Sequence, residues 1–108
     1  MEQASRKRTR APLHPGVILK YDYLEPLFIN NSKLAELLGV SRVTVSKIVN
    51  ERGPVTSNLA LRLSRTFNTT PDLWLNLQME YDLWHAENDS KEWMKAAVID
   101  DSVTGSRQ

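Results

Sequence analysis

Hydrophobic residues recur at intervals of three and four along most of this chain, which is the spacing of one face of an α-helix. No stretch of the sequence alternates with the period of two that a half-buried strand requires. Helices are expected at residues 15–25, 31–38, 42–50, 57–67 and 71–88, with a short sixth helix at 91–98. The sequence therefore predicts an all-α fold of five to six helices.

Capping and breaking residues separate these segments. Pro15 suits the first turn of a helix, and Pro26 ends that helix because the residue before a proline is pushed out of the helical region. Gly39 stands where a helix needs a left-handed residue to stop. The other predicted ends are N-terminal caps at Asn30, Ser41, Thr56, Thr70 and Ser90, and a C-terminal stop at Asn68. The apolar face of the first helix is expected to comprise Val17, Ile18, Tyr21 and Leu24.

The segment 39–50, GVSRVTVSKIVN, carries many hydrogen-bonding side chains for so short a run. At about 100° per residue, Val45, Ile48 and Val49 share one arc of the helix and are expected to face the core. The opposite arc holds Val43, Ser46, Lys47 and Asn50, with Arg42 and Thr44 flanking it. Cations, amides, hydroxyls and small apolar groups are the side chains that contact base edges and phosphates. The sequence therefore predicts that this helix reads a major groove.

The preceding helix, joined through Gly39, would complete a helix-turn-helix. Ala35 is small where the two helices would cross, and Val40 and Val45 would fill the joint. A tight pair of helices with a solvated outer face is the simpler alternative. The outward position of Val43, with cations beside it, favours DNA recognition.

The composition narrows the classes of protein. A chain of 108 residues fits one compact domain with tails, here a basic arm at 1–12, a domain at 13–88, and a short helix with a frayed tail at 89–108. The absence of cysteine excludes disulfides and thiolate chemistry, and favours a reducing cytoplasm. No apolar run is long enough to cross a bilayer, and none near the N-terminus resembles a secretory signal.

Charge is distributed unevenly, although the net charge is only +1. Residues 1–75 hold 11 Lys and Arg against 6 Asp and Glu, a balance of +5, whereas residues 76–108 hold 3 against 7, a balance of −4. This asymmetry indicates two partners of opposite charge, or one end of a dimer held away from a polyanion. The RKRTR run at 6–10 is either a solvated tail, an arm that neutralises DNA phosphates, or a segment that folds on a protein partner.

Enzyme chemistry finds no support in the sequence. His14 and His85 lie far apart and lack a second ligand at metal spacing, so no metal is expected. Glu80 and Asp82 are near neighbours on a helix but face different ways, which does not favour paired-carboxylate catalysis. There is no glycine-rich phosphate loop and no nucleophile–base set. We therefore expect no cofactor and no small-molecule substrate.

Three segments carry a resemblance to a known family. They are HPGVILKYDYLEPL, LAELLGVSRVTVSKIVNERG and ALRLSRTFNTTPDLWLNLQMEYDLW. Together, over roughly His14 to Glu87, they resemble the HigA antitoxin group within the helix-turn-helix class named after the Xre repressor, which shares the lambda-repressor-like fold. The TPDLWLNLQ motif is the most specific part. The resemblance implies a five-helix domain that dimerises, binds its own palindromic operator, and neutralises a HigB-type toxin, a ribosome-dependent mRNA endonuclease.

The resemblance also implies site residues. Arg42, Val43 and Lys47 match base-reading positions of the recognition helix. The positions that touch phosphates or bases in the family correspond to Ser41, Thr44, Ser46 and Asn50. Asn31 stands where such repressors often have the longer Gln, and Arg52 is the candidate phosphate contact in the following loop.

Trp74, Leu77, Tyr81 and Trp84 repeat at spacings of three and four in the fifth helix, which forms an a/d-type seam. The seam is expected to serve both core packing and a dimer interface, because aromatic residues are enriched at interfaces. Tyr81 and Trp84 are the favoured subunit contacts.

Three hypotheses remain at this point. The first is a cytoplasmic, homodimeric, DNA-binding autorepressor that is also an antitoxin. The second is a stand-alone transcriptional regulator without a toxin. The third, an interaction protein that no longer binds DNA, is disfavoured because Arg42 and Lys47 both lie on the outward arc.

Overall fold

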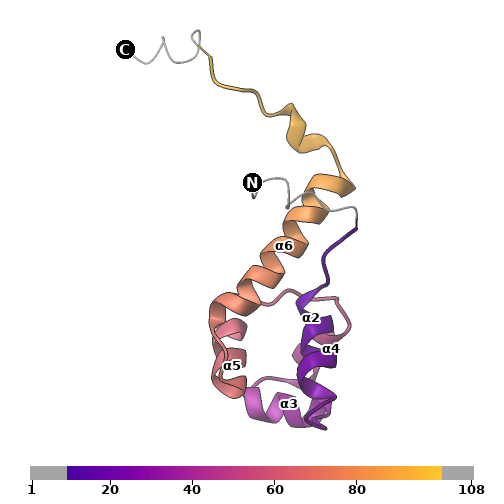
Figure 1. Ribbon diagram of the computed structural model, residues 1–108, viewed down its shortest axis with the longest axis vertical. Helices are drawn as coiled ribbons and strands as arrows, with labels where there is room; N and C mark the ends of the chain where they lie inside the picture. Colours follow the sequence, from indigo (N-terminus) through magenta and orange to yellow (C-terminus); the bar gives the residue numbers. More distant parts are fainter. Residues whose placement is uncertain (1–9, 101–108) are drawn as a thin grey trace, which may run out of the picture.

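A computed structural model describes residues 10–100, and Figure 1 shows their arrangement. The helices are α2 (Pro15–Ile18), which continues directly as the π-helix η1 (Leu19–Leu24), then α3 (Asn31–Leu38), α4 (Arg42–Val49), α5 (Ser57–Phe67), α6 (Pro71–Asp89) and the 3₁₀ turn η2 (Glu92–Lys95). No strand occurs between residues 10 and 100. The predicted all-α fold is confirmed. The predicted arm at 1–12 and the frayed tail lie largely outside the described residues.

The sequence rules for helix ends hold in four helices. The predicted caps Asn30, Ser41, Thr56 and Thr70 each accept a hydrogen bond from the backbone N–H three residues on, over 2.8 to 3.3 Å. Gly39 (φ 72°) and Asn68 (φ 57°) end their helices in the left-handed conformation. These caps satisfy backbone groups that the helices leave unpaired.

The first helix departs from the predicted face. Leu19 and Leu24 are buried, whereas Tyr21 is exposed and Val17 is only half-buried. From Leu19 onward the reason is the π-helical turn, in which the N–H of Glu25 bonds to the carbonyl of residue 20, five positions back. Residues five apart diverge by about 140° in an α-helix, but the wider turn brings Leu19 and Leu24 to the same side.

This first helix ends close to Pro26, but the predicted cause is wrong: Glu25, which precedes the proline, keeps helical angles (φ −67°, ψ −48°), and the chain turns away only at Phe28. The N–H of Ile29 bonds to the carbonyl of Leu24 and the N–H of Phe28 to that of Glu25, which is the pattern of a Schellman motif. Phe28 occupies the left-handed position with φ 57°, where glycine is favoured, and its side chain is 95% exposed. An aromatic residue is therefore both strained and solvated at this turn.

The predicted sixth helix is wrong in extent. Ser90 was expected to cap a helix over 91–98, but only the single 3₁₀ turn η2 forms there. All residues from 86 to 100 are exposed. A short helix needs packing of an apolar face to be stable in water, and among residues 10–100 nothing buries an apolar residue of this segment.

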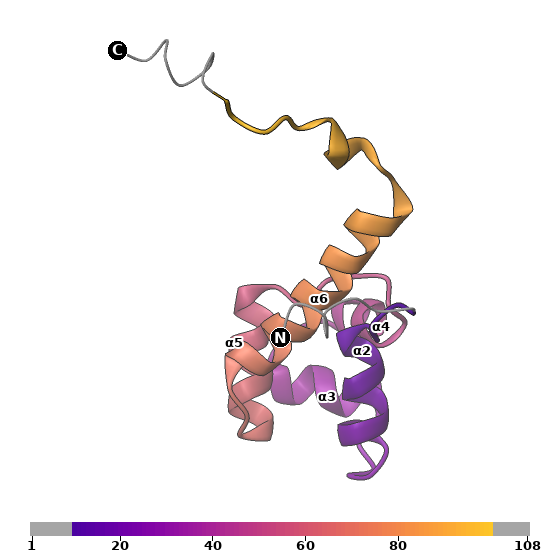
Figure 2. The ribbon, with the colours of Figure 1, turned by 45° about the horizontal axis from the view of Figure 1, so that its top comes forward.

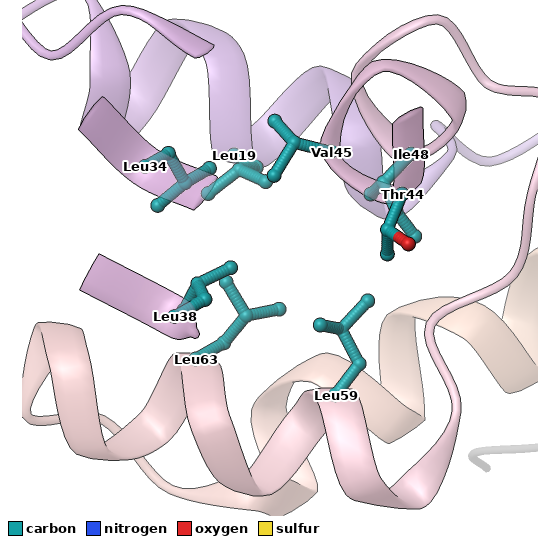
Figure 3. Close-up of a pocket in the computed structure, with 8 residues that line it drawn as sticks. All are labelled: Leu19, Leu34, Leu38, Thr44, Val45, Ile48, Leu59 and Leu63. Carbon is teal, nitrogen blue, oxygen red and sulfur yellow. The ribbon is translucent and has the colours of Figure 1, made fainter. Parts of the chain in front are cut away.

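The core lies between α2/η1, α3, α4 and α5, with Trp74 of α6 closing one side. Figure 3 shows the side chains that converge there, and they come from four helices: Leu19, Leu34, Leu38, Thr44, Val45, Ile48, Leu59 and Leu63. Trp74 is completely buried, and its Nε1 donates to Oγ1 of Thr69 over 2.9 Å. Its ring also contacts that of Tyr23. The buried hydrophobic residues of the described part of the chain thus form one cluster.

His14, Pro15 and Gly16, the HPG sequence at the start of α2, each have a structural role. Nδ1 of His14 accepts a hydrogen bond from the N–H of Gly16 over 2.9 Å, and Pro15 occupies the first helical position. A Cβ on Gly16 would lie 1.8 Å from the carbonyl oxygen of Ile48, so α2 and the end of α4 are in backbone contact. The ring of His14 also meets that of Tyr81 on α6 edge-on, at 4.9 Å between centroids. The motif therefore joins α2 to α4 and α6.

His14 is buried in this junction. Desolvation lowers the pKa of His14 below its ordinary 6.5. The charges of Glu51 and Asp82, and a hydrogen bond to the backbone of Gly53, act in the opposite direction without cancelling the effect of burial. The neutral imidazole is also the form whose Nδ1 can accept the bond that caps α2.

Candidate nucleic-acid interface

The helices α3 and α4 form the predicted helix-turn-helix. Gly39 supplies the left-handed turn between them, and its N–H bonds to the carbonyl of Ala35 over 2.9 Å. Ala35 and Val45 are buried where the two helices meet, and Val40 packs against the same core. The small residue, the turn and the two valines therefore have the positions that the sequence predicted.

The outward face of α4 is the candidate contact surface. Val43 is 63% exposed, and Arg42, Lys47 and Asn50 are exposed around it. Ser46 is half-buried on the same helix. Val45 and Ile48 face the core as predicted, and the half-buried Val49 packs at its edge. A short apolar group lies among two cations and an amide, which is a set able to contact base edges.

Hydrogen bonds hold several of these side chains in place. Nη1 of Arg42 donates to Oγ of Ser32 over 3.0 Å, which ties the start of α4 to the start of α3. Nδ2 of Asn50 donates to Oγ of Ser46 over 3.1 Å. Asn31 is exposed at the first position of α3, next to Ser32. The amino ends of both helices are thus linked before any ligand binds.

Thr44 and Ser41 are placed differently from the outward residues. The Thr44 side chain lines the core cavity in Figure 3, and its hydroxyl lies 3.0 Å from Oγ of Ser41. Ser41 also caps α4 through the N–H of Thr44. Their hydroxyls therefore serve the helix cap in this structure, while their predicted contact with DNA stays a prediction.

The loop after α4 adds a further cation. The N–H groups of Arg52 and Gly53 both bond to the carbonyl of Lys47, over 2.7 and 3.2 Å, so this loop folds back onto the end of the helix. Arg52 is exposed there. Arg42, Lys47 and Arg52 lie along this helix and its loop, and α4 itself contains no acidic residue. Glu51 is the acidic residue within the loop.

The structure also places residues here that sequence analysis missed. An open hollow of about 210 Å³ lies beside α4, lined by Lys47, Thr56 and Asn58 among others. Thr56 and Asn58 belong to the start of α5, where three polar residues follow one another. Ser32 was missed as well. A signal existed in both cases, since polar residues at helix starts often contact phosphate groups.

The predicted dimer residues of α6 divide into two groups. Trp74 is 0% exposed, so it belongs to the core of its own chain and its prediction as an interface residue is wrong. Leu77 packs against the same core. Tyr81 and Trp84 are half-buried, and both contact the ring of His85.

Beyond Tyr81 the helix leaves the body of the domain. Figures 1 and 2 both show the carboxyl-terminal half of α6 projecting outward and carrying residues 90–100 away from the other helices. Met79 and Leu83, one turn apart, are 52% and 50% exposed. Neither residue belongs to the seam of Trp74, Leu77, Tyr81 and Trp84 that the sequence predicts. Residues 10–100 therefore leave an apolar stripe on α6 uncovered.

The described part of the chain holds no candidate metal site and no membrane-spanning helix. Among residues 10–100, no group of three or more His, Cys, Asp or Glu is placed to hold a metal ion. No helix in that range has both the length and the apolar composition to cross a membrane.

Comparison with known proteins places these features in a family. A model described as "Helix-turn-helix" matches residues 23–74. The chain is 48% identical over 91 residues to the uncharacterized HTH-type transcriptional regulator YbaQ of Escherichia coli K12, covering 84% of this chain and 77% of that protein. It is 41% identical over 90 residues to Antitoxin HigA-1 of Vibrio cholerae, covering 83% and 85%.

Solved structures agree with these relatives. The antitoxin GraA in complex with its operator superposes with a TM-score of 0.75 at 37% identity, over 86% of this chain and 95% of that one. The Pseudomonas aeruginosa antitoxin HigA with the higBA promoter gives 0.75 at 36% identity, over 82% and 96%. With its helix-turn-helix, its projecting last helix and these relatives, the chain belongs to the Xre-like helix-turn-helix family that includes the HigA antitoxins.

Proposed function

We propose that this protein is a cytoplasmic, dimeric DNA-binding antitoxin that represses its own operon and neutralises a HigB-type mRNA endonuclease. The observation that carries the proposal is the outward face of α4, where Arg42, Val43 and Lys47 lie exposed on a helix-turn-helix. Solved relatives of the same fold are bound to an operator or a promoter. No enzymatic activity is part of the proposal.

The proposed contacts follow from side-chain chemistry. Arg42 and Lys47 would bind guanine edges, and Val43 would pack on a thymine methyl group. Arg42 uses one guanidinium nitrogen for Ser32, and its remaining N–H donors stay available for a base. Asn50 and Ser46 would contact bases or phosphates at the other end of the helix. The phosphate contacts would come from Asn31, Ser41, Thr44 and Arg52.

A dimer is needed because one small helix-turn-helix buries little surface on a half-site. Two copies on a palindrome would place their recognition helices about 34–36 Å apart. The exposed stripe of Met79 and Leu83, together with Tyr81 and Trp84, supports a contact through the projecting half of α6. Trp74 takes no part in that contact, because it is already buried.

The proposal that this protein binds a toxin is supported by the charge of its C-terminal part and by relatives that are named antitoxins. Residues 76–108 carry a net charge of −4, which suits a basic ribonuclease. A plain regulator without a toxin is the second candidate, and the relative YbaQ, named an HTH-type transcriptional regulator, favours it. Co-expression with the open reading frame beside this gene decides between them, since only an antitoxin restores growth to cells that make a toxin.

DNA recognition is tested on the duplex that lies upstream of this protein's own coding sequence, with a scrambled duplex of equal length. Arg42→Ala and Lys47→Ala should each cost roughly 1–3 kcal/mol of specific binding and relax preference at one base pair. Lys91→Ala is the matched control, because Lys91 follows α6 and bonds to the carbonyl of Glu87. Undiminished binding by both α4 variants would contradict the proposed role of this helix.

A further inference from the structure

Arg62 reaches from α5 to the turn of the helix-turn-helix. Its Nη1 donates to the carbonyl of Leu38, the last residue of α3, over 2.7 Å, and to the carbonyl of Gly39 over 3.2 Å. Its Nε donates to Oδ1 of Asn58 over 2.7 Å, one turn earlier on α5. The side chain is half-buried between the two helices. One guanidinium thus makes two hydrogen bonds to the turn and a third to its own helix, α5.

The end of α3 is a site that favours a cation. The last carbonyls of a helix lack intrahelical partners and carry the negative end of its dipole. No basic residue lies in the last turn of α3 itself. Arg62 supplies the positive charge from a different helix, so this cap also fixes α3 and α5 relative to each other.

Gly39 and the guanidinium fit together closely. The left-handed φ of 72° at Gly39 favours glycine, and a Cβ added there would meet Nη1 of Arg62 at 3.2 Å. Glycine at position 39 therefore allows the left-handed turn that leads into α4. Because it has no side chain, it also leaves room for the guanidinium of Arg62. A change at either residue would shift the other.

We propose that Arg62 is a positioning residue for DNA recognition, which clamps the turn between α3 and α4 against α5 and so fixes the angle at which α4 enters the groove. The inference rests on the proposed function, because it concerns the same DNA contact. Asn58 is its anchor on α5, and Asn58 also lines the hollow that contains Lys47. The position of the turn relative to α5 is therefore set by this hydrogen-bonded side chain in addition to the packing of the core.

Two substitutions distinguish the effect of the positive charge of Arg62 from that of its several hydrogen-bond donors. Arg62→Met keeps most of the length and loses every donor, whereas Arg62→Lys keeps the charge on a single nitrogen, which cannot occupy the positions of both Nη1 and Nε. Arg65→Met is the matched control, because Arg65 is exposed one turn further along α5. Each protein is titrated with the upstream duplex and with the scrambled duplex, well below its melting temperature.

The expected result is a loss of specificity rather than of general affinity. Arg62→Met should lower the ratio of operator to scrambled binding about tenfold, because hydrogen bonds to charged groups are among the stronger ones. Arg62→Lys should lose less, and Arg65→Met should match the wild type. The double variant with Asn58→Ala should be no worse than Arg62→Met alone, since the two residues act as one unit.

A control variant that lowers stability at another place in the fold tests whether Arg62 acts on DNA recognition only by stabilising the protein. Thr69→Ala removes the acceptor of the Trp74 indole N–H in the α5–α6 loop, and should lower stability without altering the ratio. An unchanged ratio in Arg62→Met, or an equal loss in Thr69→Ala, would overturn the inference while leaving the proposed function intact. A wild-type protein that does not distinguish the two duplexes would overturn the proposed function, and this inference with it.

Discussion

Gly16 offers a sharp test of how the first helix is seated on the recognition helix. A Cβ at this position would lie 1.8 Å from the carbonyl oxygen and 2.8 Å from the carbonyl carbon of Ile48. Folded proteins essentially never show Cβ contacts under 3.0 Å, so the added methyl group overlaps the α4 backbone by more than 1 Å. Both partners are backbone, and neither can rotate away. Gly16→Ala must therefore move α2 relative to α4.

The cost follows from two opposing effects. Overpacking in a well-packed core costs roughly 1–3 kcal/mol and occasionally more, and a clash with backbone belongs at the upper end of that range. The gain from replacing glycine by alanine within a helix is about 1 kcal/mol. We therefore expect a net loss of about 2 kcal/mol in the free energy of unfolding. For a domain of this size, the midpoint of thermal unfolding should fall by roughly 8–16 °C.

Guanidinium unfolding followed by tryptophan fluorescence measures this loss, because Trp74 is buried in the folded state. Gly53→Ala is the matched control. Its Cβ would lie 3.2 Å from the Cβ of Lys47 and 3.9 Å from the Lys47 carbonyl carbon, which is a tight contact but not the overlap found at Gly16. The control should change stability by less than about 1 kcal/mol. If Gly16→Ala proved as stable as Gly53→Ala, α2 would not be packed on α4 as the structure has it.

Three further substitutions test other features. Trp84→Glu should leave the circular dichroism spectrum intact but weaken the dimer, because it would place an unpaired charge in the proposed contact; a variant that still sediments as a dimer places the contact elsewhere. Because folding lowers the pKa of His14, stability should be complete above pH 6.5 and decline as the pH falls below it. His14→Gln should lack this dependence, and an identical pH profile in both proteins would show that His14 is not its source. Phe28→Gly should raise stability by about 1 kcal/mol in denaturant titrations, since it removes left-handed strain from an exposed side chain; a loss would mean that the ring makes a stabilising contact.

Local rules predicted much of this fold. Caps such as Ser41, and the left-handed stop at Gly39, depend on neighbouring residues alone and were found where expected. The same holds for the outward position of Val43 and Lys47, because the arc of a regular helix follows from its period. The DNA contacts themselves stay predictions, since they depend on a partner molecule.

The errors have physical causes that a residue pattern does not contain. The face of the first helix was wrong because one π-turn shifts the angular position of each residue after Leu19. Trp74 has the spacing of an interface seam, but tertiary packing decides whether such a residue is covered by its own chain or by another. The hydrogen bonds from Arg62 to Leu38 and Gly39 could not be predicted for the same reason, because they join residues that are 24 and 23 positions apart in the sequence.

The projecting half of α6 has a consequence for the operators this protein can accept. Its last buried residue is Gln78, and Tyr81 one turn later still packs on His14, but the helix beyond Tyr81 lies outside the core and can change length without disturbing it. In the proposed dimer, each residue inserted there would move each helix-turn-helix by about 1.5 Å relative to the subunit contact and rotate it by about 100°. A single insertion would thus put the second recognition helix on the wrong side of the duplex, while three or four would return it with a longer spacing. The length of this helix would then determine which spacing between operator half-sites the dimer can bind.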